Sequence, residues 1–250
     1  MSENERARPA PATVRRIDQG EIIGLLAGTG AHVWRGLPFA ASTAGENRWR
    51  EPQPAPAWEG RREAVRFAER CAQMTTPGDK EEGLKPGILV GSEDCLALDI
   101  YAPPDAEGKT LPVMVWIHGG YNVWGRSGSY DGSHLALAGD VIVVAVQYRL
   151  GPLGWFAHPF VRDTARDPED AAASFATLDL VASLRWVRHN IAAFGGDPGN
   201  VTIFGESAGG HNVVTLLASP LAKGLFHRAI IQLSLIHISE PTRPNAPSRM

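Results

Sequence analysis

Two continuous apolar runs mark the middle of the chain, Pro112–Ile117 (PVMVWI) and Val141–Val146 (VIVVAV). Both are short and rich in β-branched residues, which is typical of strands buried on both faces of a parallel sheet. A further strand is expected to begin at Ala229. These runs predict the central strands of the fold.

The periodicity becomes helical between residues 174 and 194. Apolar residues recur there at steps of four and three, and two glycines follow as a stop signal; the residues are Leu180, Leu184, Val187, Ile191, Phe194, Gly195 and Gly196. A short strand at 201–204 and a helical stretch at 212–218 come next. The alternation of strands and helices predicts an α/β fold with a mostly parallel central sheet and helices on both faces.

The first 60 residues, rich in Pro, Gly and Arg, predict short strands and loops. Residues 73–91 predict a polar surface loop between Cys71 and Cys95. Two cysteines are too few for a disulfide scaffold, and by themselves they fit two buried thiols. Neither lies in a CxxC motif, so we expect no metal or dithiol redox site.

Composition is that of an ordinary globular protein, with 44% hydrophobic and 20% charged residues among 250. A net charge of −3 argues against nucleic acid or an anionic membrane as partner. No apolar run is long enough for a membrane span, and no signal peptide follows the N-terminal arginines. The compartment stays open: the cytoplasm, or export if the natural start lies upstream. The oligomeric state is not determined.

The motif that carries chemistry is Gly205-Glu206-Ser207-Ala208-Gly209, which fits G-x-S-x-G. It lies between a predicted strand and a predicted helix, as a nucleophile elbow requires. We therefore predict Ser207 as the nucleophile and the main-chain N–H of Ala208 as an oxyanion donor.

A second glycine motif, His118-Gly119-Gly120-Tyr121, ends the earlier buried strand. A loop of this kind supplies further oxyanion donors, here the N–H groups of Gly120 and Tyr121. We interpret His118 as a structural loop histidine, because in this fold the catalytic base follows the serine in the chain.

Together these residues resemble the type B carboxylesterase family, which includes bacterial para-nitrobenzyl esterases and the cholinesterases. The matching segments are Arg35–Ala40, Ser92–Leu96, His118–Gly120, Tyr130–Gly132, Tyr148–Gly151, Phe194–Pro198 and Gly205–Gly210. The resemblance implies an α/β-hydrolase fold and a serine esterase acting on small carboxylic esters without metal or cofactor. It also implies a Cys71–Cys95 disulfide and an ion pair between Arg48 and Glu93.

The chain departs from the family pattern at two positions of the oxyanion loop. Tyr121 stands where the family usually has a small residue, and Asn122 where it usually has an aromatic one. Both changes keep the main-chain N–H. A bulky residue at 121, however, resists the positive φ that such a loop requires.

The resemblance ends at Gln232, so we assign residues 1–232 to the N-terminal part of a single α/β-hydrolase domain. Residues 233–250 predict a non-native tail, because LSLIHISEPTR at 233–243 resembles a translated sequencing adapter. Because His237 lies in this tail, we reject it as the triad base. We also reject Glu206 as the triad acid, because the side chains of neighbouring residues on a tight elbow point apart.

The truncated chain therefore lacks the triad acid and histidine, and we expect it to be inactive. The alternative function is a non-catalytic, cholinesterase-like binding module. The presence of Ser207 counts against that alternative.

Overall fold

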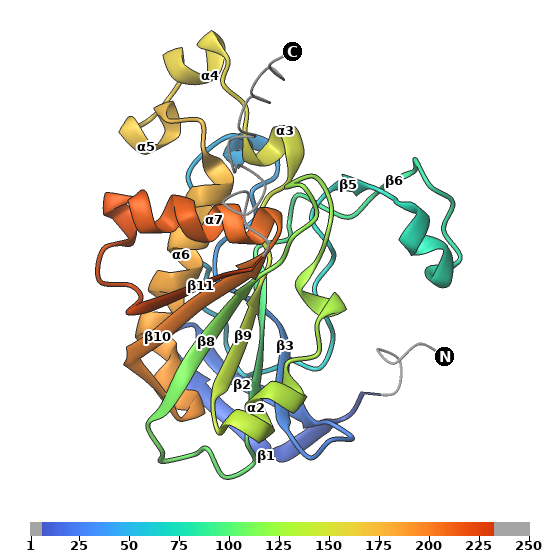
Figure 1. Ribbon diagram of the computed structural model, residues 1–250, viewed down its shortest axis with the longest axis vertical. Coiled ribbons are helices and arrows are strands. Elements are labelled where there is room, and N and C mark those ends of the chain that lie inside the picture. The colour runs from blue at the N-terminus through green and yellow to red at the C-terminus, as the bar shows by residue number, and fades with distance from the viewer. Residues whose placement is uncertain (1–6, 233–250) are drawn as a thin grey trace, which may run out of the picture.

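The computed structural model describes residues 7–232. A large mixed sheet runs through the molecule in the order β1-β2-β3-β7-β9-β8-β10-β11, with β4 paired to β2, and a small second sheet pairs β5 with β6 (Figure 1). The strands are β1 (Pro9–Ile17), β2 (Gly20–Leu26), β3 (His32–Pro38), β4 (Arg61–Glu63), β5 (Gln73–Met74), β6 (Leu89–Val90), β7 (Ala97–Ala102), β8 (Leu111–Ile117), β9 (Ile142–Val146), β10 (Gly196–Glu206) and β11 (Arg228–Gln232).

Helices fill most of the connections in the second half of the chain. They are α2 (Ser133–Gly139), α3 (Gly151–Gly154), α4 (Pro159–Asp163), α5 (Pro168–Ala171), α6 (Phe175–Asn190) and α7 (Ala208–Ala218), with 3₁₀ turns η1 (Gly45–Asn47), η2 (Pro77–Glu82), η3 (Ser127–Ser129), η4 (Ile191–Phe194) and η5 (Pro220–Ala222). The strands and the long helix predicted from the apolar pattern are all present, which confirms those predictions.

Strands β9, β8, β10 and β11 are mutually parallel. The other half of the sheet consists of β1, β2, β3 and β7, in which each strand pairs antiparallel with the next. Strand β7 also pairs antiparallel with β9, where the two halves meet. Because parallel neighbours end at the same edge, the turns that follow β8 and β10 leave the sheet side by side. The fold thereby brings the two glycine motifs together.

The two faces of the parallel half are covered unequally. On one face, Val113, Val115 and Ile117 of β8 are buried in the main core, which includes side chains of α6 and α7. On the other face α2 contributes Ala136 to a smaller cluster, and Met114 and Trp116 stay only partly buried against it. The prediction that β8 is buried on both faces is therefore wrong for the described residues, whereas β9 is buried throughout.

A buried ion pair connects the end of the parallel half to helix α6. Arg149 donates from Nε and Nη2 to the two carboxylate oxygens of Asp179, at 2.9 and 2.6 Å. The main-chain N–H of Arg149 donates to the same carboxylate at 3.0 Å. Removing one partner of such a pair leaves an uncompensated buried charge, so this contact fixes how the segment after β9 meets α6.

The predicted loop at 73–91 contains more regular structure than its polar sequence suggested. It holds β5, η2 and β6, which form a small antiparallel arm beside the sheet (Figure 1). Thr76 and Asp79 close a capping box at the start of η2, and Asp79 also pairs with Arg70 at 2.6 Å. These local polar contacts, rather than an apolar pattern, organise the segment.

Candidate active site

Ser207 occupies a sharp turn between β10 and α7. Its backbone has φ 55° and ψ −122°, a conformation that non-glycine residues rarely adopt. Helix α7 begins at the next residue, so Ser207 is its N-cap. The Ser207 N–H donates to the carbonyl oxygen of Gln232, at the end of β11, at 2.9 Å. The strained turn is thus held by the strand ends on either side of it.

The glycines of the motif are required by close backbone approach. A Cβ atom on Gly209 would lie 2.0 Å from the carbonyl oxygen of Ile117, and one on Gly205 would lie 2.6 Å from the carbonyl carbon of Gly209. Helix α7 can therefore start against the end of β8 only because these positions carry no side chain. The helix N-terminus and the Ala208 N–H, which has no intrahelical acceptor, lie beside Ser207.

The loop after β8 lies directly against the elbow. A Cβ atom on Gly119 would lie 3.3 Å from the Cβ of Ser207 and 2.8 Å from the carbonyl oxygen of Glu206. Gly120 has φ 102° and accepts from the N–H groups of Val123 and Trp124 at 3.0 and 3.1 Å. Within residues 7–232, the N–H groups of Gly120 and Tyr121 make no hydrogen bond. Two free main-chain donors therefore lie in the loop that borders Ser207.

Tyr121 adopts the backbone angle that its size resists. It has φ 55°, Asn122 follows with φ 59°, and the Tyr121 side chain is 79% exposed. The loop thus contains two successive left-handed residues that are not glycine. The unfavourable angle expected at Tyr121 is present and is accommodated.

His118 is buried, and its ring contacts lie within this loop and against Tyr148. Its ring stacks on Tyr148 with centroids 4.5 Å apart, and its Nδ1 lies 2.8 Å from the Gly119 carbonyl oxygen. Burial lowers the pKa of His118 to about 4, although the hydrogen bond with Gly119 opposes that shift. A neutral ring can donate from Nδ1 to Gly119, which agrees with a structural role.

The Ser207 side chain makes no capping hydrogen bond to α7, and within residues 7–232 no histidine or carboxylate is bonded to its hydroxyl. Glu206 is half-buried, and its charge helps to raise the pKa of Tyr130, after the larger effect of burial. His237, which the sequence had excluded as base, lies outside the described residues, as does the tail at 233–250.

The other predicted pairs also meet. Cys71 and Cys95 form a disulfide with Cα atoms 5.0 Å apart. Arg48 and Glu93 form a bidentate ion pair near the surface, in which Arg48 Nε donates to the Glu93 carboxylate at 2.6 Å. Both contacts lie in or beside the arm that contains β5 and β6. Among the described residues no group of His, Cys, Asp or Glu is arranged to hold a metal ion.

Two grooves differ in their relation to Ser207. One, of about 380 Å³, lies between the disulfide arm and the loop after β8, and it is lined in part by Gln73, Trp124 and Tyr130. It borders the loop after β8 through Trp124 and Gly125.

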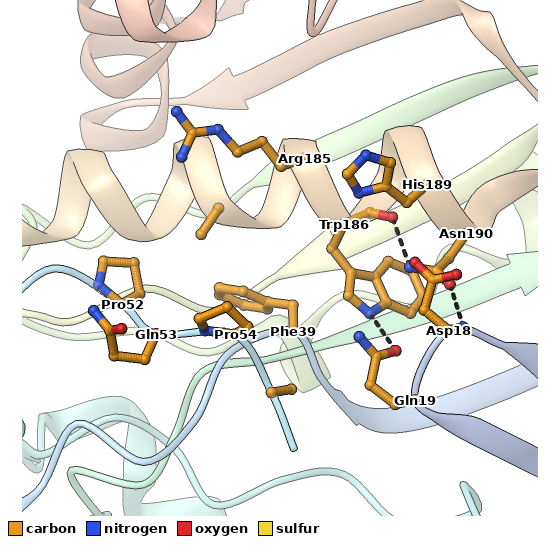
Figure 2. A pocket seen from close by; sticks show the side chains of 12 residues that line it. Asp18, Gln19, Phe39, Pro52, Gln53, Pro54, Arg185, Trp186, His189 and Asn190 are labelled. Carbon is orange, nitrogen blue, oxygen red and sulfur yellow. Dashed lines mark hydrogen bonds between the residues drawn. The ribbon is translucent and has the colours of Figure 1, made fainter. Parts of the chain in front are cut away.

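The other groove, of about 300 Å³, lies beside α6 and shares no residue with the elbow or the oxyanion loop (Figure 2). Its floor contains Phe39 and Trp186, and the Trp186 indole donates to Gln19 at 3.2 Å. Asn190 accepts from the Asp18 N–H at 2.8 Å. These contacts join the turn between β1 and β2 to α6, which is a packing role.

The sequence model described as the carboxylesterase family matches residues 11–239. The chain belongs to the carboxylesterase family. The Ser207 elbow and the loop after β8 therefore lie within a carboxylesterase α/β-hydrolase fold.

Curated relatives with similar sequences include a cocaine esterase of Oryctolagus cuniculus, 45% identical over 88% of this chain and 41% of its own length. A para-nitrobenzyl esterase of Bacillus subtilis (strain 168) is 45% identical over 81% of this chain and 40% of its own. The chain thus spans about two fifths of the length of the relatives that it matches.

Solved structures agree with the sequence comparison. A thermophilic PNB esterase aligns with a TM-score of 0.78 and 42% identity, over 88% of this chain and 44% of that one. A carboxylesterase of Geobacillus stearothermophilus aligns with a TM-score of 0.74 and 42% identity, over 87% and 43%. Within residues 7–232, no helix combines the length and apolar character needed to cross a bilayer.

Two residues at the site were not assigned a role from the sequence. Asn212 of α7 donates from Nδ2 to the side-chain oxygen of Asn122 at 2.9 Å. Gln73 of the disulfide arm donates to the Gly125 carbonyl and accepts from the Gly125 N–H, at 2.9 and 2.8 Å. An isolated amide carries no motif, so nothing in the sequence pointed to either contact.

Proposed function

We propose that the polypeptide carrying this chain hydrolyses carboxylic esters through an acyl-enzyme formed on Ser207. The observation that carries the proposal is the approach of the Gly119 loop to the Ser207 turn, which puts free N–H donors beside a nucleophile position. Family membership supports the same reaction class.

In the proposed reaction the Ser207 oxygen forms a bond to the ester carbonyl carbon as its proton passes to a base. The negative charge that develops on the carbonyl oxygen is held by the N–H groups of Gly120, Tyr121 and Ala208. The bond to the alcohol then breaks, the alcohol leaves with the proton, and water releases the acid by the reverse sequence. The base and its orienting acid come from residues outside 7–232.

We propose that the 250-residue chain by itself has no esterase activity, because residues 7–232 bring no base to Ser207. Without a base the serine stays protonated at neutral pH, and oxyanion donors and binding alone retain only about 10³–10⁴-fold catalysis over water. The names of the relatives support small-molecule esters as substrates. A non-catalytic binding module is the less favoured alternative, because Ser207 is retained.

The decisive experiment is Ser207→Ala in the full-length polypeptide, assayed with a short-chain p-nitrophenyl ester. We expect kcat to fall by about 10⁶, as for loss of the serine in other serine hydrolases, and fluorophosphonate labelling to disappear. Ser219→Ala, at the far end of α7, is the matched control and should stay within twofold of the wild type. Activity of the Ser207 variant within tenfold of the wild type would refute the assignment. The matching anilide distinguishes an esterase from an amidase.

A further inference from the structure

A pair of asparagines joins the two turns of the site. Asn122 belongs to the loop after β8, and Asn212 lies in α7, five positions after Ser207 in the chain. The Asn212 amide donates to the Asn122 side-chain oxygen at 2.9 Å, across 90 residues of sequence. Asn212 is only 4% exposed, so its end of the contact is shielded from competing water.

Asn122 is also held through two further contacts. The Tyr148 hydroxyl lies 3.4 Å from the same side-chain oxygen, and it donates to the His118 carbonyl at 2.6 Å. The main-chain carbonyl of Asn122 accepts from the Gly151 N–H at 2.7 Å. The side chain and the backbone of this one residue are thus anchored to two segments, helix α7 and the stretch that follows β9.

Such anchoring matters because this part of the loop is conformationally unfavourable. Tyr121 and Asn122 both have left-handed backbone angles, and residues held in such regions persist only where their surroundings determine them. Asparagine tolerates this conformation better than most side chains. The free N–H groups of Gly120 and Tyr121 come immediately before Asn122, so their direction depends on how Asn122 is fixed.

We propose that Asn122 is a positioning residue for the oxyanion donors, and that Asn212 sets its distance from the nucleophile by binding its side chain. The inference rests on the proposed function, because it assigns these residues to the same ester hydrolysis. Asn122 touches no reacting atom in this scheme. It acts by keeping the Gly120 and Tyr121 N–H groups aimed at the place where negative charge develops.

The test separates backbone freedom from the side-chain contact. Asn122→Gly removes the side-chain oxygen while glycine still adopts the left-handed backbone angle without strain, whereas Asn212→Ala removes the amide donor. In the full-length polypeptide each should lower kcat for a p-nitrophenyl ester by about 10- to 100-fold, with KM within twofold. This is less than the 10²–10³ lost when a donor is removed outright. Both variants break the same Asn122–Asn212 hydrogen bond. The double variant should therefore lose no more kcat than either single variant does.

Two further measurements exclude a merely structural effect. A trifluoromethyl ketone, which adds to the serine and forms an oxyanion, should bind more weakly by the same factor as kcat falls. Inhibition by p-nitrophenol should be unchanged. Thr215→Ala, on the exposed side of α7, is the matched control and should leave kcat within twofold.

Wild-type kcat and ketone affinity in the two single variants would overturn the proposal. Single losses that multiply in the double variant would overturn it as well. Failure of the proposed function looks different, because then the wild type neither turns over the ester nor labels at Ser207. That result removes the positioning role as well. Normal wild-type turnover with unaffected asparagine variants removes the positioning role alone.

Discussion

The turns after β8 and β10 leave neighbouring parallel strands at one edge of the sheet, yet they are held in different ways. The turn at Ser207 has a single residue between strand and helix, and glycines on each side permit its close approaches. The loop after β8 is longer and is held by distant partners, Gln73, Tyr148 and Asn212. The first turn is specified by its own sequence, and the second by the fold around it.

The largest effect should follow from a change within the short turn. Gly209→Ala places a methyl group 2.0 Å from the Ile117 carbonyl oxygen, a backbone atom that cannot move without displacing β8. We expect a loss of about 3 kcal/mol or more in the free energy of unfolding, measured by urea denaturation of the full-length polypeptide. Gly28→Ala is the matched control, since a methyl group there meets nothing within 4 Å. Equal stability of the two variants would mean that the turn does not depend on this glycine.

Removing the disulfide tests whether the longer loop relies on remote support. The bond joins cysteines 24 residues apart, and Gln73, two residues after Cys71, holds Gly125. Changing both cysteines to serine should cost about 3 kcal/mol on the chain-entropy account. Hydrogen exchange should accelerate at residues 120–125 but not at 205–210. Faster exchange at both turns would contradict the difference between them.

Acidification should weaken the support beneath the loop. The pKa of His118 is lowered from 6.5 to about 4, so its contribution to stability is complete above pH 6.5 and is lost as the pH falls towards 4. The size is on the order of 3 kcal/mol. The ring-nitrogen chemical shift of His118, followed from pH 7 to pH 4, reports this titration directly. A midpoint near 6.5 would show that the ring is not buried.

Asp99 has the opposite effect on stability as the pH falls, so its contribution has to be measured apart from that of His118. Burial raises its pKa to about 6, despite hydrogen bonds from Ser127 and Gly36, so its contribution is complete below pH 3.8 and is lost as the pH rises through 6. Asp99→Asn removes this counterweight. Its unfolding free energy should therefore fall more steeply than that of the wild type between pH 6 and pH 4, by an amount on the order of 3 kcal/mol over the window. Parallel curves would contradict the assignment.

The smallest effect should come from Tyr121→Gly. Glycine relieves the left-handed strain by about 1 kcal/mol, but it gains a similar amount of entropy in the unfolded chain. Stability should therefore change by less than about 1 kcal/mol, and kcat by less than threefold. Gly120→Ala is the contrasting neighbour, because φ is 102° and a methyl group there would lie 2.0 Å from the Trp124 carbonyl oxygen. Calorimetric unfolding of the Tyr121→Gly and Gly120→Ala variants shows whether the stability of the loop depends on Gly120 or on Tyr121.

Much of the architecture could be predicted from the sequence. The apolar runs indicated β8 and β9, and the change to helical periodicity indicated α6. The strand, the glycines and the following helix indicated a sharp turn at Ser207. These features depend on neighbours along the chain, and short-range sterics and periodicity are visible in the order of residues.

The rest was decided by the tertiary structure. The sequence could not show that Met114 and Trp116 would stay partly exposed, because that depends on which helices cover each face. Nor could it show the Asn122–Asn212 contact or the low pKa of His118. A single amide or imidazole has no periodic signature, and its partner and its burial are fixed only when segments distant in the chain pack together. The sequence by itself determined where the sharp turn at Ser207 lies, and the fold determined how the neighbouring loop is held against it.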